Sequence, residues 1–217
     1  MKIPNDVKDI HLLGDIHGDY AKHDRFAKKN HFTIQLGDFG FNFDSLKKHD
    51  PNYHKVLGGN HDNYDLIKDV PHYLGDFGTF ELDTSSSPES TYPSRVIKIF
   101  YIRGADSIDK QLRTIGVDWW AEEQLSMVRM REALDLYAQY KPDVILSHSP
   151  PAFAIEWFCN PRMPFALTEH CLDAMHEIYS PQLHIFGHMH KKKSKKLGAT
   201  KFICVDINEK ISLIKSF

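Results

Sequence analysis

Five short stretches of this chain carry side chains that bind metal ions well, and most of them follow directly on an apolar run. A strand that ends at a glycine delivers the next side chain to the end of a sheet, where ligands commonly bind. Five such ends can bring their side chains to one place. The set therefore predicts a metal site, with these candidate ligands in chain order: Asp15, His17, Asp38, Asn60, His148, His188 and His190.

The donor types indicate which metals would bind. Neutral imidazole and carboxylate oxygen together suit divalent first-row metals. The set contains no cysteine, which disfavours a structural zinc site of the cysteine type. Seven ligands are too many for one tetrahedral ion, so we expect two ions that share a carboxylate. Asp38 is the natural bridge, because its motif supplies one carboxylate and no neighbouring ligand. We expect manganese, with Fe, Zn, Ni or Co as alternatives.

The spacing within the motifs suggests a role for each side chain. Side chains at i and i+2 of an extended chain point to the same side, so Asp15 and His17 can reach the metals together. Ile16 would then turn away, as would the residue between His188 and His190. His61 follows a candidate ligand directly and is predicted to be the general acid for the leaving oxygen. Asp62 is predicted to hold the ring of His61.

A two-metal site has a characteristic chemistry. Two ions roughly 3.5–4 Å apart clamp the attacking and leaving oxygens of a displacement at phosphorus, and a water bound to them becomes hydroxide near neutral pH. The sequence therefore predicts hydrolysis of a phosphate ester, with hydroxide as the nucleophile and His61 as the acid.

The motifs resemble those of the calcineurin-like metallophosphoesterase superfamily, which run D-x-H, G-D, G-N-H-D/E, a lone His and G-H-x-H. The match covers roughly residues 8–207 in order. The resemblance implies an α/β fold, a four-layer sandwich of two mixed β-sheets flanked by helices, with a dimetal site at the strand ends. It also implies one metal on Asp15, His17 and His190, a second on Asn60, His148 and His188, the bridge at Asp38, and proton donation by His61.

One departure concerns the second motif. In the protein Ser/Thr phosphatase branch it reads G-D-x-x-D-R-G, whereas Phe39, Gly40, Phe41 and Asn42 follow Asp38 here. The Asp that would orient the general acid and the Arg that would hold phosphate are missing. This favours a phosphomonoesterase or phosphodiesterase of the wider superfamily. The stretch 102–110, with the two tryptophans that follow, is similar to a segment of small bacterial and phage members.

Two arginines are candidates for the missing phosphate-binding group, since a guanidinium offers paired donors to phosphate oxygens. Arg103 and Arg113 are predicted to bind substrate, and a salt-bridge role is equally open for both. Arg162 is a weaker candidate. The lysine run 191–196 is either a positive rim that attracts phosphorylated substrate or a solvated hairpin tip, and the second is slightly favoured. Trp119 and Trp120 are expected in the core, with base stacking as the alternative.

Three functions remain open at this stage. The main prediction is a phosphomonoesterase acting on nucleotides or phosphoproteins. The first alternative is a phosphodiesterase or nuclease acting on nucleotides or nucleic acid, and the second is a non-catalytic, metal-bound interaction scaffold. The histidines outside the motifs are expected to be ordinary surface or core residues: His11, His23, His31, His49, His54, His72, His170, His176 and His184.

Size and composition are consistent with a single domain over residues 1–217, of which 41% are hydrophobic. The net charge of −2 disfavours general binding to nucleic acid. Three cysteines without framework spacing suit a reducing cytoplasm. No signal-peptide core and no run near the ~18 apolar residues of a membrane span is visible. We therefore expect a soluble cytoplasmic protein with no membrane contact. The sequence does not indicate an oligomeric state.

The elements that must position these motifs alternate between strands and helices. Short segments rich in β-branched and aromatic residues predict strands at 10–13, 32–36, 55–57, 80–82, 96–102, 144–146, 183–186, 202–205 and 211–214. Helices are predicted at 20–29, 44–49, 120–140 and 168–179, with Asp19 capping the first and Thr168 the last. Residues 83–94 are predicted to be a loop. The pattern by itself indicates a mixed α/β fold.

Overall fold

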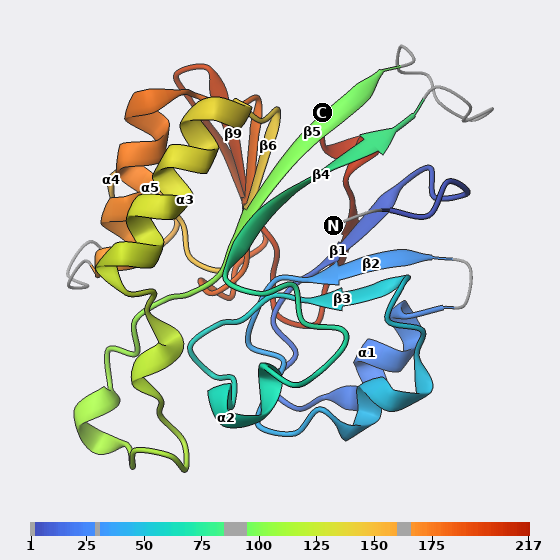
Figure 1. Ribbon diagram of the computed structural model, residues 1–217, viewed down its shortest axis with the longest axis vertical. Coiled ribbons are helices and arrows are strands. Elements are labelled where there is room, and N and C mark those ends of the chain that lie inside the picture. The colour runs from blue at the N-terminus through green and yellow to red at the C-terminus, as the bar shows by residue number, and fades with distance from the viewer. Residues whose placement is uncertain (1–2, 29–30, 85–94, 160–165) are drawn as a thin grey trace.

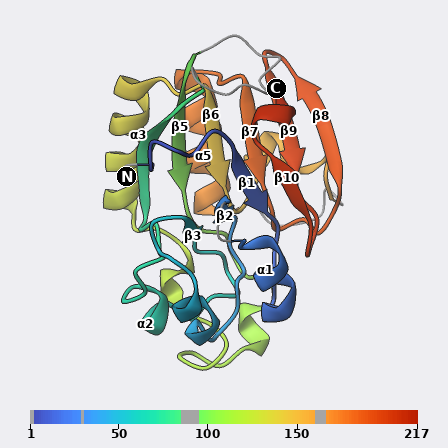
Figure 2. The same ribbon diagram turned by 90° about the vertical axis from the view of Figure 1, so that its right-hand side faces the viewer.

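The computed structural model describes residues 3–28, 31–84, 95–159 and 166–217. Within them the chain forms two mixed β-sheets that pack face to face, with helices on both outer sides (Figure 1). Figure 2 shows the smaller sheet in front of the larger one.

The smaller sheet has four strands in the order β10-β1-β2-β3. The strands β1, β2 and β3 are parallel to one another, and the edge strand β10 is antiparallel to β1. Parallel strands are apolar because both of their faces are covered, and β1 and β2 are buried along almost their whole length. The bounds are β1 Ile10–Leu13, β2 Phe32–Gln35, β3 His54–Val56 and β10 Lys210–Ser212.

The larger sheet has six strands in the order β4-β5-β6-β7-β9-β8. Its four central strands are parallel, and antiparallel strands form both edges. The bounds are β4 Phe77–Asp83, β5 Val96–Ile102, β6 Val144–Ser147, β7 Leu183–Phe186, β8 Lys193–Leu197 and β9 Thr200–Cys204.

The main core fills the space between the two sheets. Leu12 and Ile34 of the smaller sheet and Ile99, Leu146 and Ile185 of the larger one belong to a single buried cluster. A second cluster joins the outer face of the larger sheet to α3 (Met127–Tyr140) and α5 (Leu167–Ile178). The predicted four-layer α/β sandwich is therefore confirmed.

The remaining helical elements are short. On the side of the smaller sheet lie α1 and α2 (Figure 1). The bounds are α1 Tyr20–Phe26, α2 Tyr64–Ile67 and α4 Ala152–Ile155, with 3-10 turns η1 Asp44–Lys48, η2 Lys110–Leu112, η3 Ala121–Glu123 and η4 Ile214–Ser216. In the part of the chain that the structure describes, no helix is both long and apolar enough to cross a membrane.

Two helix predictions need correction. The predicted helix 120–140 is a 3-10 turn, η3, followed by a break and then α3, because Ser126 caps α3 by accepting the backbone N–H of Arg129. Thr168 does not cap α5. Its hydroxyl donates to Gln124, and the helix instead begins after Ala166, whose backbone N–H is accepted by Glu169. Asp19 does cap α1, through the backbone N–H of Lys22.

The sequence missed one strand, β8, because four of its five residues are lysine or serine. β8 is an edge strand, and lysines on an edge strand prevent pairing with another chain. The lysine run is therefore partly sheet edge rather than hairpin tip. Residues 85–94 of the predicted loop lie outside the described residues, as does Arg162.

Candidate metal centre

Every predicted ligand follows the carboxyl end of a parallel strand. Asp15 and His17 come after β1, Asp38 after β2 and Asn60 after β3, all from the smaller sheet. The larger sheet supplies His148 after β6 and the last pair of histidines after β7. Parallel strands of one sheet end at the same edge. The loops from the two packed sheets meet where their two carboxyl edges lie next to each other.

The first group of ligand atoms comes from Asp15, His17, Asp38 and His190, and one donor atom of each lies within 4.8 Å of the others. The Nε2 atoms of His17 and His190 are 2.9 Å apart. The Oδ2 atom of Asp15 is 2.9 Å from His190 Nε2, and the Oδ2 atom of Asp38 is 3.6 Å from His17 Nε2. Donor atoms from three strand ends therefore face one another.

The second group comes from Asp38, His148 and His188, again with one donor atom of each within 4.8 Å. His148 Nε2 lies 3.2 Å from Asp38 Oδ1 and 3.2 Å from Asn60 Oδ1. The other ring nitrogen of His148 bonds the carbonyl of Leu36 at 2.7 Å, which leaves Nε2 for the shared centre. Asp38 belongs to both groups, which is where a bridging ligand would lie.

The buried oxygens indicate that these residues suit metal ions. Neither Asp15 Oδ2 nor Asp38 Oδ2 accepts a hydrogen bond, although imidazole nitrogens lie close to both. A buried carboxylate oxygen without a hydrogen bond is costly, and a cation would satisfy it. The set of imidazole, carboxylate and amide donors is also the one that first-row divalent metals prefer. The residues present therefore fit two such ions.

The ligand backbones are strained. His17, Asp38, His188 and His190 have φ between 45° and 61°, in the left-handed region that residues other than glycine rarely adopt. Such strain concentrates at functional sites. The D-x-H and H-x-H motifs lie in turns after the strands. The prediction that their spacing reflects an extended chain is therefore wrong.

The two residues between the paired candidate ligands both contact apolar clusters, although Met189 also lines the cavity beside His188 and His190. Ile16 is buried in an apolar cluster with Phe39, and Met189 packs against another cluster that includes Phe186. Glycine is required beside the ligands. A Cβ at Gly187 would collide with the carboxylate of Asp15, and one at Gly59 would collide with Asp38 and His148.

Opposite charges stabilise each other in the second group. Burial alone would lower the pKa of His148, but the carboxylate of Asp38 raises it to about 10. Burial would raise the pKa of Asp38, and His148 instead holds it well below its ordinary value. Burial together with charged His148 lowers the pKa of His188 to about 4. Because a metal binds neutral imidazole, metal uptake would release the proton of His148.

The sequence predicts that Asp62 holds the ring of His61, and this prediction is wrong. Its buried carboxylate accepts three backbone N–H groups, from Asp38 at 3.0 Å, Gly40 at 2.9 Å and Gly59 at 2.8 Å. Asp62 therefore joins the loops after β2 and β3. The reason is geometric, since the carboxylate is directed into these loops and not toward the neighbouring imidazole.

The ring of His61 contacts Arg113 instead. The two outer nitrogens of the guanidinium lie 3.1 Å from the two ring nitrogens. Asp109 holds the same guanidinium through Nε at 2.8 Å and Nη2 at 2.9 Å. Burial lowers the pKa of His61, with Arg113 adding to the effect and Asp38 opposing it. Arg113 thus lies beside the predicted general acid, His61.

Arg103 lies elsewhere. Its side chain is buried, with 7% of the residue exposed, and its Nε donates to Asp76 at 2.7 Å. Another nitrogen of its guanidinium donates to the carbonyl of Glu122, and the group stacks on the ring of Tyr64 at 4.7 Å. These contacts join the end of β5 to the loop before β4 and to η3. The structure therefore favours the salt-bridge role for Arg103 over the predicted substrate contact.

Sequence reasoning missed two residues that support Asn60. The amide Nδ2 of Asn60 donates to Ser107 Oγ at 3.2 Å, which leaves Oδ1 directed at His148. Ser107 in turn donates to Glu123, from its hydroxyl at 2.7 Å and its backbone N–H at 2.9 Å. Glu123 is buried with 1% exposed. Ser107 lies in the stretch 102–110 that the sequence had singled out, but nothing there indicated its partner.

A cavity of about 410 Å³ opens beside the ligands. Its lining includes Asp38, Asn60, His61, Arg113 and His188, so the predicted acid, the arginine and ligands of the second group face one space. This volume suits a small or flexible substrate. A larger cavity of about 710 Å³ contains none of the predicted ligands.

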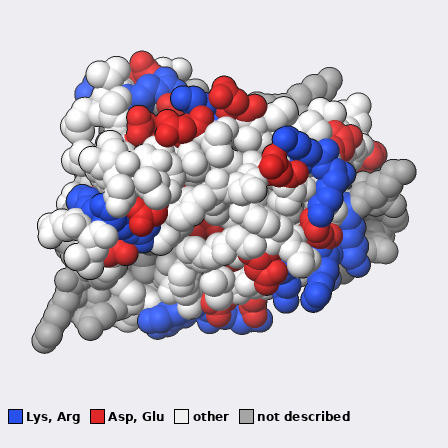
Figure 3. All heavy atoms as spheres, turned by 90° about the horizontal axis from the view of Figure 1, so that it is seen from below, with Lys and Arg blue, Asp and Glu red and all other residues white. Residues whose placement is uncertain are grey.

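The other predicted substrate contacts are partly engaged elsewhere. Lys192 pairs with Glu209 at 3.1 Å, and Lys195 lies over the ring of Trp157. Trp120 is buried and donates to Asp65 at 2.8 Å, which confirms its place in the core. Figure 3, which views the molecule from below, shows basic and acidic side chains in mixed groups around a largely uncharged centre.

Comparison with known proteins gives a consistent picture. The family model described as calcineurin-like phosphoesterase matches residues 9–192. A search of curated proteins found no match. Among solved structures, a dimetal phosphatase from Danio rerio is similar with a TM-score of 0.55 at 12% identity, covering 93% of this chain and 88% of that one.

Two further structures are similar at comparable distance. Phosphopantetheinyl hydrolase from Mycobacterium tuberculosis has a TM-score of 0.51 at 14% identity, covering 92% of this chain and 90% of that one. GAP50, the anchor in the inner membrane complex of Plasmodium, has a TM-score of 0.52 at 11% identity, covering 92% of this chain and 71% of that one. At these identities the likeness concerns the fold alone.

Proposed function

We propose that this chain, which belongs to the calcineurin-like phosphoesterase family and is a metal-dependent phosphoesterase, hydrolyses phosphate monoesters with two divalent ions. One observation carries the proposal. Two groups of donor atoms share Asp38, and His61 and Arg113 line the cavity beside them. A two-metal site, an acid and a phosphate-binding arginine are the parts that such a reaction needs.

The ligands follow from the two groups. Asp15, His17 and His190 would hold one ion, Asn60, His148 and His188 the other, and Asp38 would bridge them. When bound, the ions supply an activated water and neutralise charge on the phosphoryl group. We propose manganese, since these donors suit it, with Fe, Zn, Ni and Co as alternatives.

The chain's own residues would then do three things. Arg113 would bind the phosphoryl oxygens through the Nη1 and Nη2 donors that face His61, while Asp109 holds Nε and the other side of Nη2. His61 would donate a proton to the leaving oxygen. Asp62 would keep the loops that carry Asp38 and His61 in register.

The substrate proposal rests on the cavity. Its volume and Arg113, the one arginine among its described lining residues, suit the phosphate end of a small molecule, such as a nucleotide, or of a flexible phosphopeptide. We also propose that the protein is cytoplasmic. The alternatives to a phosphomonoesterase are a phosphodiesterase and a non-catalytic, metal-bound scaffold.

Substitution of His61→Asn tests the proposal. We expect turnover of an alkyl phosphate monoester, whose leaving oxygen needs a proton, to fall about 10²- to 10⁴-fold, because general acid catalysis contributes that much, while metal content and fold stay unchanged. Turnover of bis-para-nitrophenyl phosphate in preference to para-nitrophenyl phosphate would favour the phosphodiesterase. A wild type that binds two ions but hydrolyses neither compound would favour the scaffold.

A further inference from the structure

A second group of metal-binding side chains lies outside the motifs, around α1. His23, Asp24 and His49 each offer a donor atom, and the three atoms lie within 4.8 Å of one another. His23 and Asp24 come from α1, and His49 follows η1. From the sequence alone, both histidines are expected to be ordinary surface or core residues.

The contacts within this group are close. His49 Nε2 lies 2.8 Å from Asp24 Oδ1. The rings of His23 and His49 have their centroids 5.4 Å apart and are inclined by 77°. Two further histidines surround the group, since the ring of His54 lies 5.3 Å from that of His49 and His72 Nε2 lies 3.0 Å from the carbonyl of His49.

His23 lacks a partner for a buried polar atom. The residue is 1% exposed, and its Nδ1 makes no hydrogen bond. Leaving such a nitrogen unsatisfied costs free energy, which a ligand on the ring would recover. Burial, helped by His49, also lowers the pKa of His23 to about 3. The imidazole is therefore neutral near pH 7, the form that binds metals.

Two cavities reach one member of the group, His49. His49 lines the cavity of about 710 Å³ together with His72, and it also lines a second cavity together with Lys48 and His54. An ion can therefore reach His49 and the part-exposed carboxylate of Asp24 from solvent, and His23 would complete the set from the buried side.

One cation already competes for the carboxylate. Lys48 Nζ lies 2.5 Å from Asp24 Oδ2, while Oδ1 faces His49. The Lys48 side chain is 54% exposed, so it can move into solvent at little cost. Removal of its charge should therefore strengthen binding of a cation at Asp24.

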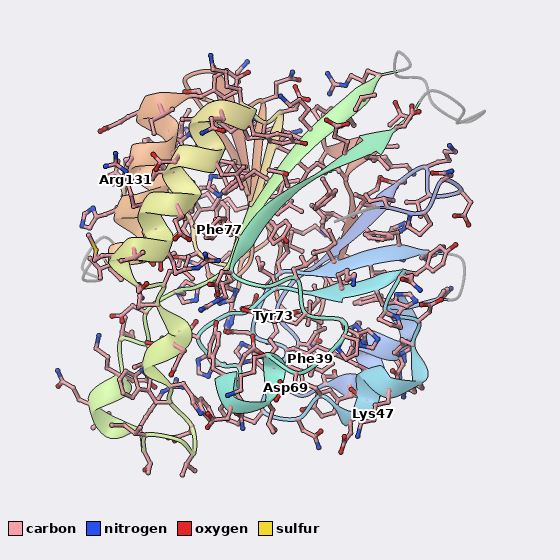
Figure 4. All side chains as sticks on the ribbon, in the orientation of Figure 1. Phe39, Lys47, Asp69, Tyr73, Phe77 and Arg131 are labelled. Atoms are coloured by element: carbon pink, nitrogen blue, oxygen red, sulfur yellow. The ribbon has the colours of Figure 1, made fainter. Side chains whose placement is uncertain are left out.

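We propose that His23, Asp24 and His49 bind a third divalent ion, of the zinc class, at a site separate from the two-metal centre. Two imidazoles and one carboxylate are a common zinc-binding set, and water would complete the tetrahedron. The ion would link α1 to the segment after η1. The ring of His23 packs edge-on against Phe39 at 5.0 Å, and Phe39 follows Asp38 directly. Figure 4 shows Phe39 in the region of α1 and α2, where such a link would stabilise the packing.

The test counts ions by elemental analysis after metal-stripped protein is dialysed against micromolar zinc. We expect His49→Gln and Asp24→Asn to retain one zinc ion per chain fewer than the wild type. His170→Gln, which changes an exposed histidine on α5, should retain the wild-type number. Equal zinc content in the wild type and both α1-site variants would overturn the proposal. If His49→Gln fails to fold by circular dichroism, Asp24→Asn decides.

A second variant changes the affinity in the opposite direction. Lys48→Gln should bind the additional zinc ion several-fold more tightly in a calorimetric titration, because it removes the competing ammonium. Unchanged or weaker binding would contradict an ion at Asp24. Zinc content and zinc affinity do not depend on phosphate hydrolysis. The third-ion site can therefore be disproved while the proposed function holds, and the proposed function can be disproved while the third-ion site holds.

Discussion

The carboxylate of Asp62 accepts the backbone N–H of Asp38 at 3.0 Å, while the carboxylate of Asp38 accepts the backbone N–H of His61 at 2.7 Å. The second and third motifs thus hold each other through both side chains and backbone. Asp62 can therefore position the loop that carries the predicted acid, His61, without contacting its ring.

Substitution of Asp62→Ala should destabilise the fold. The change leaves three buried N–H groups without an acceptor, and we expect a loss of about 3 kcal/mol or more in the free energy of unfolding. Asp62→Asn keeps one acceptor oxygen and should lose less. Urea unfolding in the presence of a chelator measures both. Wild-type stability in Asp62→Ala would contradict the role of these bonds.

Arg113 should matter for substrate binding. Arg113→Ala should lower kcat/KM for a phosphate monoester about 10- to 100-fold, since a hydrogen bond to a charged group is worth that much. Asp109→Asn should show a smaller loss, because the guanidinium would keep its charge but not its position. Arg131→Ala, on the outward side of α3, is the control (Figure 4). Equal kinetics for Arg113→Ala and the control would exclude phosphate contact.

Glu123 should position a metal ligand. Glu123→Gln replaces an acceptor of the Ser107 bonds with an amide donor, so Asn60 would lose its fixed orientation. Loss of such a supporting partner typically costs 10- to 100-fold in metal affinity. Titration of manganese into stripped protein tests this. Restoration of affinity by the double variant Glu123→Gln, Ser107→Ala would count against a positioning role.

Stability should fall in mild acid. Burial lowers the pKa of His54 to about 4 and that of His23 to about 3, whereas an unfolded histidine titrates near 6.5. The unfolded chain therefore binds more protons between pH 6.5 and 4, so stability is complete above this window and decreases as pH falls through it. The slope is up to about 1.4 kcal/mol per pH unit for each histidine.

The acid effect can be assigned by substitution. In chelator, His54→Asn should lose less stability between pH 6.5 and 4.5 than the wild type in urea unfolding. His170→Asn, at an exposed position, should follow the wild type. Equal slopes for His54→Asn and the wild type would show that His54 does not remain neutral in the folded chain.

Much of the fold could be predicted because apolar strand segments are short and distinct. The strands at Ile10–Leu13, Val96–Ile102 and Leu183–Phe186 begin and end where the apolar pattern does. β8 was missed because an edge strand need not be apolar. The helix 120–140 was overextended because side-chain spacing does not reveal the cap at Ser126.

The predicted ligands come together because each motif follows a parallel strand, and strand order brings their ends to one edge. The roles of Asp62 and Arg103 were not readable, since backbone N–H acceptors and buried salt bridges depend on tertiary neighbours. Positive φ at His17 and His188 was equally hidden, because only glycine signals it in a sequence. The group at His23 and His49 lacked any motif, because α1 and η1 bring the two together only in the fold.

The most direct test of the two-metal account is hydrolysis of para-nitrophenyl phosphate by metal-stripped and manganese-reconstituted protein, compared between wild type and Asp38→Asn. We predict that stripped wild type is inactive, that manganese restores turnover, and that Asp38→Asn binds fewer ions at the motif residues and stays inactive with manganese. Hydrolysis by exhaustively stripped wild type, or wild-type metal content and rate in Asp38→Asn, would contradict a two-metal centre bridged by Asp38.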